Sequence, residues 1–172
     1  GVCRVFFGGF MTQTTYKGLA ALALENDLLR LTLLPGYAWK IASLVSKKTG
    51  REFLFQSAAE ELRVPEYGAS FSEYDASGFD EVFPSIDACP YPDGSWAGMP
   101  IPDHGEVWAL PWEGVGTPDH KALKAFVRSQ TLPYIFSKSV SIKNNEILWE
   151  YCVENTALED FKFIWTPHCL LA

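Results

Sequence analysis

The chain has 172 residues, of which 48% are hydrophobic, and its 14 Lys and Arg against 21 Asp and Glu give a formal net charge of −7. Because nucleic acids and membrane surfaces are recognised through clusters of Lys and Arg, this acidic balance excludes both as expected partners. The hydrophobic share is that of a folded protein, and no apolar run approaches the roughly 20 residues that cross a bilayer, so we expect one globular domain over residues 1–172.

The first half of the chain carries the alternating pattern of half-buried strands. Leucines alternate with polar residues over 29–33, and a Pro-Gly turn follows. Residues 41–45 form a second apolar run, and residues 52–56 resume extended structure. The sequence at 57–60 reads S-x-x-E, the capping box that begins many helices, and it predicts the start of one short helix.

The second half carries the clearest hairpin. Residues 139–143 and 147–154 alternate between apolar and polar side chains, and the Asn-Asn pair between them is typical of a turn. Aromatic residues alternate again over 161–165 and predict the start of a further strand. Since almost no segment has helical periodicity, the sequence predicts an all-β domain, either a sandwich or an open barrel.

The middle of the chain, residues 64–120, has a different composition. It contains no Lys or Arg, but 11 of the 21 acidic residues, 8 of the 11 prolines and three of the six tryptophans. Proline removes a hydrogen-bond donor from a strand, so this density predicts long loops, and the aromatic residues predict that the loops are ordered. The segment is where we expect a site. Its lack of cations disfavours a phosphorylated ligand, which would need Arg or Lys.

The first candidate constellation lies around His104. Asp103 and Glu106 flank this histidine, and Trp108 and Trp112 follow it. Indole rings offer flat apolar faces on which sugar rings stack, and carboxylates accept hydrogen bonds from sugar hydroxyls. The alternative is a loop histidine that only hydrogen-bonds a neighbouring turn.

The second candidate constellation combines His168 with an acidic pair. Pro167 interrupts the ladder before His168 and can turn the imidazole out of the sheet; the alternative is a core histidine that bonds a backbone carbonyl. Asp80 and Glu81, in an aromatic loop, can order sugar hydroxyls. They predict no metal site, because further oxygen ligands at regular spacing are missing. The third histidine, His120, is predicted to be an ordinary surface residue.

The four cysteines are far apart and form no C-x-x-C pair: Cys3, Cys89, Cys152 and Cys169. A zinc site is therefore not expected, and reduced thiols in the cytoplasm fit this usage. The first residues do not form a secretory signal, which agrees with a cytoplasmic location.

Several segments together resemble the aldose 1-epimerase (galactose mutarotase-like) family. The resemblance is spread in order over roughly residues 20–172. The segments that carry it are 25–31 with 34–44, 78–84, 103–105 with 111–113, and 148–155 followed by 163–168.

This resemblance implies a β-supersandwich that binds a neutral monosaccharide across a concave sheet. It further implies that His168 donates a proton to the ring oxygen while His104 holds the substrate. No cofactor or metal takes part in such chemistry. The expected substrate contacts are the acidic and tryptophan residues of the two constellations: Asp80, Glu81, Asp103, Glu106, Trp108 and Trp112.

Members of that family continue beyond the second histidine to a sugar-binding aspartate and a glutamate base. This chain ends at Ala172 and has no counterpart of either residue. We therefore expect a catalytically incomplete epimerase-like protein. Two alternatives remain open: a non-catalytic carbohydrate-binding domain, or a fragment of a longer sugar epimerase. A sandwich without its last strands leaves an apolar face and an open edge, which predicts a homodimer.

Overall fold

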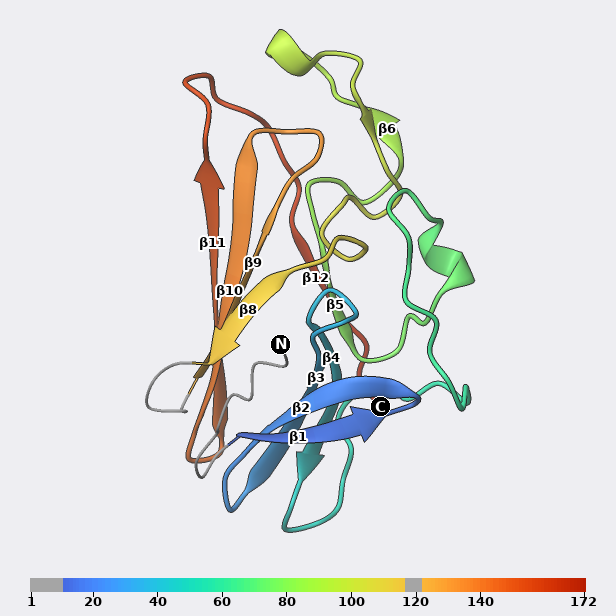
Figure 1. Ribbon diagram of the computed structural model, residues 1–172, viewed down its shortest axis with the longest axis vertical. Helices are drawn as coiled ribbons and strands as arrows, with labels where there is room; N and C mark the ends of the chain where they lie inside the picture. The colour runs from blue at the N-terminus through green and yellow to red at the C-terminus, as the bar shows by residue number, and fades with distance from the viewer. Residues whose placement is uncertain (1–10, 117–121) are drawn as a thin grey trace, which may run out of the picture.

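The protein is an all-β sandwich, as the sequence predicted (Figure 1). Its structure is a computed structural model that describes residues 11–116 and 122–172. One sheet has six strands in the order β1-β2-β3-β4-β5-β12, and the facing sheet has four in the order β11-β10-β9-β8. A two-stranded ribbon, β6-β7, extends from one end.

Every strand pair among the described residues is antiparallel. The six-stranded sheet consists of β1 (Met11–Tyr16), β2 (Leu19–Glu25), β3 (Leu29–Leu34), β4 (Lys40–Ser46), β5 (Phe79–Val82) and β12 (Thr166–Cys169). The four-stranded sheet consists of β8 (Glu113–Gly116), β9 (Ala122–Arg128), β10 (Tyr134–Lys143) and β11 (Glu146–Asn155). The ribbon is β6 (Cys89–Pro90) with β7 (Pro100–Ile101), and two 3-10 turns span Phe71–Glu73 and Gly94–Trp96.

The main hydrophobic core lies between the two sheets. Ile41 of β4 and Phe83, just after β5, belong to the same buried cluster as Leu123 of β9 and Phe136 of β10. The Phe83 ring lies 5.1 Å from the Phe136 ring between centroids, so aromatic contacts join the sheets directly. The predicted hairpin is confirmed as β10 and β11, whose alternation places one apolar row of each strand in this core.

Two local predictions are wrong. No helix begins at Ser57, because its hydroxyl and carbonyl accept hydrogen bonds from Lys17 and the following chain is tied down where Leu62 N–H donates to the Lys17 carbonyl. Residues 161–165 are not a strand, and β12 begins only at Thr166. Phe161 and Phe163 instead pack against the aromatic core, with Phe163 4.8 Å from the Phe83 ring.

Most of the segment from residue 64 to residue 116 forms ordered loops, as predicted, although the short strands β5, β6, β7 and β8 also lie within it. Asp80 and Glu81 lie on β5, between β4 and β12 in the larger sheet, and not in a loop. The strand forms because residues 79–82 contain no proline and their acidic side chains find buried lysine partners. His120 lies outside the described residues.

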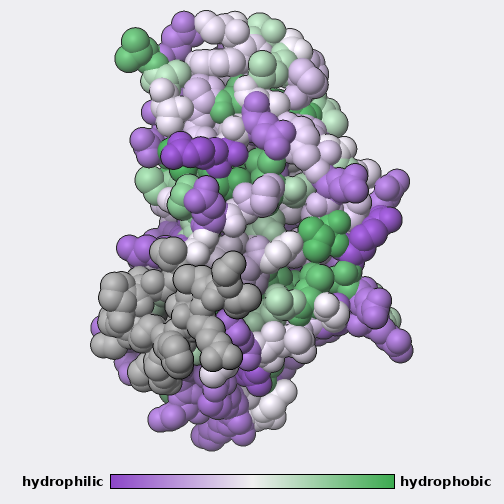
Figure 2. All heavy atoms as spheres, viewed as in Figure 1, coloured by the Kyte–Doolittle hydropathy of each residue, from purple (hydrophilic) through white to green (hydrophobic). Residues whose placement is uncertain are grey.

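The described surface is mixed in character. Figure 2 shows hydrophobic residues in small groups among polar ones on the face that it presents. No helix in the described ranges has the length and apolar character needed to cross a bilayer. Cys89, Cys152 and Cys169 are free thiols, and Cys3 precedes the first described residue.

Candidate functional site

His104 and His168, 64 positions apart in the sequence, lie side by side in the fold. Their ring centroids are 6.2 Å apart, and the ring planes are nearly perpendicular at 82°. Phe71, from the first 3-10 turn, stacks on His104 at 4.1 Å and meets His168 edge-on at 5.2 Å. The loop after β7, the strand β12 and the turn at Phe71–Glu73 thus converge on one aromatic cluster.

Asp103 holds His104 and Phe71 in place. One carboxylate oxygen lies 2.9 Å from Nδ1 of His104, and the other accepts a hydrogen bond of 2.8 Å from the backbone N–H of Phe71. Since a carboxylate only accepts, His104 carries a hydrogen on Nδ1. Partial burial tends to raise the pKa of Asp103, but these bonds outweigh it and hold the pKa below its usual value.

Gly105 lets this loop cross the end of β5. Its φ is +73°, and a Cβ at this position would lie 2.1 Å from the carbonyl oxygen of Phe83. The next N–H, that of Glu106, donates to the same carbonyl at 2.8 Å. The close approach that a glycine permits here is therefore to the chain's own backbone.

His168 faces Asp80 across the β5–β12 ladder. The two residues are register partners, so their side chains are on the same face of the sheet. Nδ1 of His168 is buried and has no hydrogen-bond partner among the described residues. Burial lowers the pKa of His168; the Asp80 carboxylate opposes this, and the nearby His104 lowers it further.

The lowered pKa of His168 predicts a pH-dependent stability. The unfolded chain takes up this proton near pH 6.5, the ordinary pKa of histidine, whereas the folded protein takes it up only at lower pH. The free energy of unfolding should therefore fall as pH drops below about 6.5 and level off below the folded pKa. Urea unfolding between about pH 5 and pH 8 checks this, and His168→Gln should flatten the dependence. A variant that keeps the full slope would assign it to another group.

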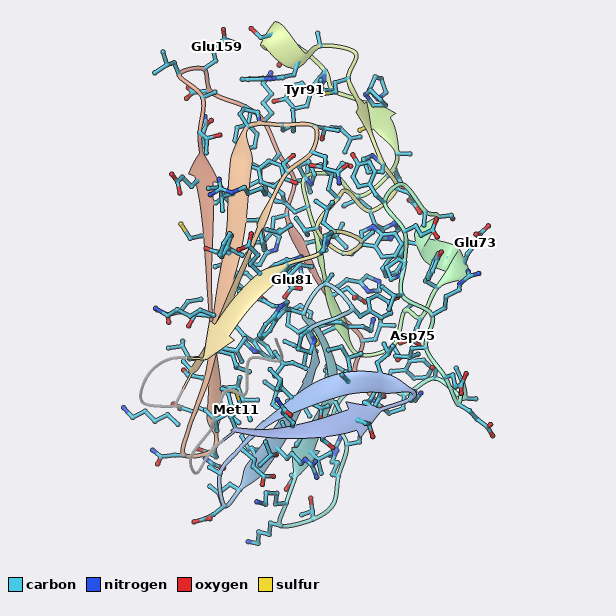
Figure 3. All side chains as sticks on the ribbon, viewed as in Figure 1. Met11, Glu73, Asp75, Glu81, Tyr91 and Glu159 are labelled. Atoms are coloured by element: carbon cyan, nitrogen blue, oxygen red, sulfur yellow. The ribbon has the colours of Figure 1, made fainter. Side chains whose placement is uncertain are left out.

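Asp80 and Glu81 are both buried, but on opposite faces of β5. Asp80 pairs with Lys40 of β4, on the side of the histidines. Glu81 accepts hydrogen bonds from Lys138 at 2.8 Å and from the Tyr151 hydroxyl at 3.1 Å, between the sheets. Figure 3 shows Glu81 toward the middle of the molecule. Only Asp80 of this predicted pair therefore shares the histidine face.

Glu106 is fully buried and serves the fold. It accepts hydrogen bonds from the hydroxyls of Tyr67 (3.0 Å), Tyr134 (2.8 Å) and Ser129, and from the backbone N–H groups of residues 130 and 131. With its oxygens engaged in this way, Glu106 does not face the open surface that its predicted contact with a sugar requires.

Trp108 and Trp112 are also buried, with 2% and 7% of their surface exposed. Trp108 Nε1 donates to the Asp103 carbonyl at 2.9 Å, and Trp112 Nε1 donates to the Val107 carbonyl at 2.7 Å. Trp108 packs edge-on against Phe71 at 5.0 Å. The expected flat faces for a sugar are thus not exposed, and Trp108 supports the cluster through Phe71.

Two residues of the cluster were missed by sequence reasoning. Phe71 lies among serines and acids, and its only signal is that it is the one large apolar residue between Tyr67 and Tyr74. Lys40 is a charged residue directly before an apolar run, and this pattern does not reveal that the ammonium group pairs with a buried carboxylate. Contacts with residues far away in the sequence hold both Phe71 and Lys40 in the cluster.

Three hollows lie elsewhere on the described surface. The first, of about 690 Å³, lies on the four-stranded sheet and is lined by residues that include Lys124, Phe126 and Glu150. The second, of about 290 Å³, lies beside the β6-β7 ribbon, and the third, of about 360 Å³, is lined mainly by residues 55–63 and 73–77. None of the three is lined by His104 or His168. The candidate site therefore depends on the contact between the His104 and His168 rings.

Among the described residues, no cluster of three or more His, Cys, Asp or Glu could hold a metal ion.

Comparisons with known proteins bear on the fold. No protein-family model matches the sequence, and no curated protein matches it. The structure is similar to that of the Slr1438 protein from Synechocystis sp. PCC 6803, with a TM-score of 0.61 and 18% identity over 84% of this chain and 52% of that one. It is also similar to a TPR-domain containing protein from Parabacteroides distasonis ATCC 8503, with a TM-score of 0.49 and 16% identity over 78% of this chain and 21% of that one.

A third similar structure is that of HI1317, with a TM-score of 0.48 and 11% identity over 80% of this chain and 45% of that one. The chain thus spans about half the length of Slr1438, at an identity that relates the two folds alone. None of the three names states an activity. The likeness to Slr1438 shows a fold shared with part of a longer protein.

Proposed function

We propose that this chain binds a neutral monosaccharide at His104 and His168, as an aldose 1-epimerase-like protein. One observation carries the proposal: two imidazoles from distant segments meet at 6.2 Å against one aromatic ring. The His104 side chain is 23% exposed, so a ligand can reach its ring without displacing the core. Imidazole nitrogens both donate and accept hydrogen bonds, which suits vicinal sugar hydroxyls.

The same pair suits the acid half of an anomer interconversion. A protonated His168 would give its proton to the ring oxygen while a base takes the proton of the anomeric hydroxyl. The bond between C1 and the ring oxygen then breaks, and the ring closes on its other face. Imidazole suits this transfer because its pKa lies near neutrality. With no free carboxylate assigned as the base, we propose binding without efficient turnover by this chain.

A polarimetric assay tests the catalytic part of the proposal. We expect freshly dissolved α-glucose or α-galactose to mutarotate at the buffer rate when the protein is added. An acceleration that disappears in His168→Ala would show that the chain is a complete enzyme, and would overturn our inference that it lacks its base.

Calorimetric titration with neutral monosaccharides tests the binding part. We expect His104→Ala and His168→Ala each to weaken binding at least tenfold, which corresponds to about 1.4 kcal/mol. Lys124→Ala, in the 690 Å³ hollow of the four-stranded sheet, is the matched control and should bind as the parent does. If Lys124→Ala weakens binding and the histidine variants do not, the sugar binds in that hollow and the proposed site is wrong.

A second candidate function is that of one part of a longer sugar epimerase. The chain's coverage of only 52% of Slr1438 favours it. A coding frame that continues beyond Ala172 and restores mutarotation when expressed in full would support this candidate over a stand-alone binding domain. Location in the cytoplasm remains part of the proposal.

The predicted homodimer also remains a proposal. It would cover the outer edge of β12 and the exposed apolar side chains near it, such as Ile164 and Leu171. Light scattering should show an average mass that rises with concentration toward twice 19.2 kDa. A constant monomer mass at high concentration would exclude the dimer.

A further inference from the structure

β5 carries two buried carboxylates, and only one of them faces His168. Asp80 and Glu81 are each 2% exposed, and each forms an ion pair with a buried lysine. Adjacent residues of a strand point to opposite faces, so only one of them can face a given neighbour. Asp80 is the register partner of His168, and Glu81 is the partner of Pro167. The strand thus presents one carboxylate to the imidazole and turns the other into the core.

Lys40 holds the Asp80 carboxylate in place. Its ammonium group is completely buried, bonds Asp80 directly, and donates to the backbone carbonyl of Asp75 at 2.9 Å. The Asp75 carboxylate lies 3.8 Å from the same ammonium group. Burial raises the pKa of Asp80, and the Lys40 ammonium opposes this rise through its charge and its hydrogen bond. Separating such a buried pair would leave an uncompensated charge, which is strongly unfavourable, so Lys40 favours the ionised form of Asp80 close to the imidazole.

The other groups that face His168 do not supply this charge. His104 approaches from the loop after β7 and can only add positive charge, and Phe71 presents an apolar edge. Nδ1 of His168 is buried and has no hydrogen-bond partner in the part of the chain that the structure describes. Burial alone would disfavour the charged ring. Among the described charged groups that act on His168, Asp80 is the one that raises its pKa and so favours the imidazolium.

We propose that Asp80, held ionised by Lys40, is a positioning residue that keeps His168 able to carry the proton it donates in the sugar chemistry. The use of that proton rests on the function proposed above, but the electrostatic coupling of the three residues does not. In this arrangement Lys40 has two opposing effects: it keeps Asp80 charged, and its own charge acts weakly against the imidazolium.

An NMR titration of the histidine ring protons in the full chain tests this coupling without any sugar. Asp80→Asn should lower the pKa of His168 and leave several-fold less imidazolium at a fixed pH near the midpoint. Glu81→Gln is the matched control, because it removes an equally buried, lysine-paired carboxylate from the same strand on the other face. It should leave the His168 titration unchanged.

A double variant, Lys40→Met with Asp80→Asn, removes both members of the ion pair, and the Asp75 carboxylate keeps its hydrogen bond from the Ser77 hydroxyl, so this variant serves if Asp80→Asn alone does not fold. The pKa of His168 should then be lower than in the parent but higher than in Asp80→Asn. The inference is overturned if both variants titrate as the parent does, or if Glu81→Gln produces the same shift. Sugar binding is measured separately: a shifted titration without sugar binding would retain the coupling and refute the proposed function.

Discussion

Replacing Glu106 by alanine is expected to lower the free energy of unfolding by about 3–5 kcal/mol, because several donors lose their acceptor at once and each such loss costs about 1–3 kcal/mol where the donor stays out of water. Glu106 has no exposed surface and accepts five hydrogen bonds, from three hydroxyls and two backbone N–H groups. Alanine would remove the acceptor of the buried Tyr134 hydroxyl and of four partly buried donors. Urea denaturation monitored by tryptophan fluorescence measures the loss.

Glu113→Ala provides the control for Glu106→Ala. Glu113 is exposed at the start of β8, and its removal should change stability by no more than about 0.5 kcal/mol. Equal losses in the two variants would show that Glu106 is not the organising acceptor of its loop. A loss confined to Glu106→Ala would also support separate roles for three neighbouring residues. His104 belongs to the candidate site, Gly105 lets the loop cross β5, and Glu106 stabilises the loop.

Gly105→Ala is expected to destabilise the protein by about 2–4 kcal/mol and to displace His104. Part of this cost comes from the positive φ, about 1–2 kcal/mol for a residue with a Cβ. The remainder comes from a steric clash, because an added Cβ would lie only 2.1 Å from the carbonyl oxygen of Phe83. The backbone must move to relieve this overpacking. Thermal unfolding measures the stability, and the His104 ring signals report the displacement.

Gly50→Ala separates these two contributions. Gly50 has nearly the same φ, +70°, but no atom lies within 4 Å of the position of an added Cβ. This variant should cost only about 1–2 kcal/mol, the conformational part alone. If Gly105→Ala costs no more than Gly50→Ala, the close crossing of the loop over β5 does not exist as described.

Local patterns in the sequence were sufficient for much of the fold. The β10–β11 hairpin follows from strict alternation about an Asn-Asn turn, and β3 and β4 follow from apolar runs bounded by turns. β5 was not recognised because two adjacent acids between Gly78 and Pro84 are typical of a loop. It is a strand only because Lys40 and Lys138, from distant segments, neutralise those acids in the interior.

The candidate site was predictable only in part, because long-range contacts also determine which of its side chains are buried. The approach of His104 and His168 was expected from the resemblance, which places both in one sugar site. The burial of Trp108 and Trp112 was not, because each indole N–H finds a carbonyl five residues earlier, a contact that composition does not reveal. Phe71 reaches the site through a bond from its backbone to Asp103, 32 residues away.

The most direct measurement is an NMR titration of the ring protons of His104 and His168 with a neutral monosaccharide at constant pH. If the two rings form one binding site, both sets of signals shift together and yield the same dissociation constant. If only one ring responds, or neither does while the sugar binds elsewhere on the protein, the two histidines do not form a carbohydrate site.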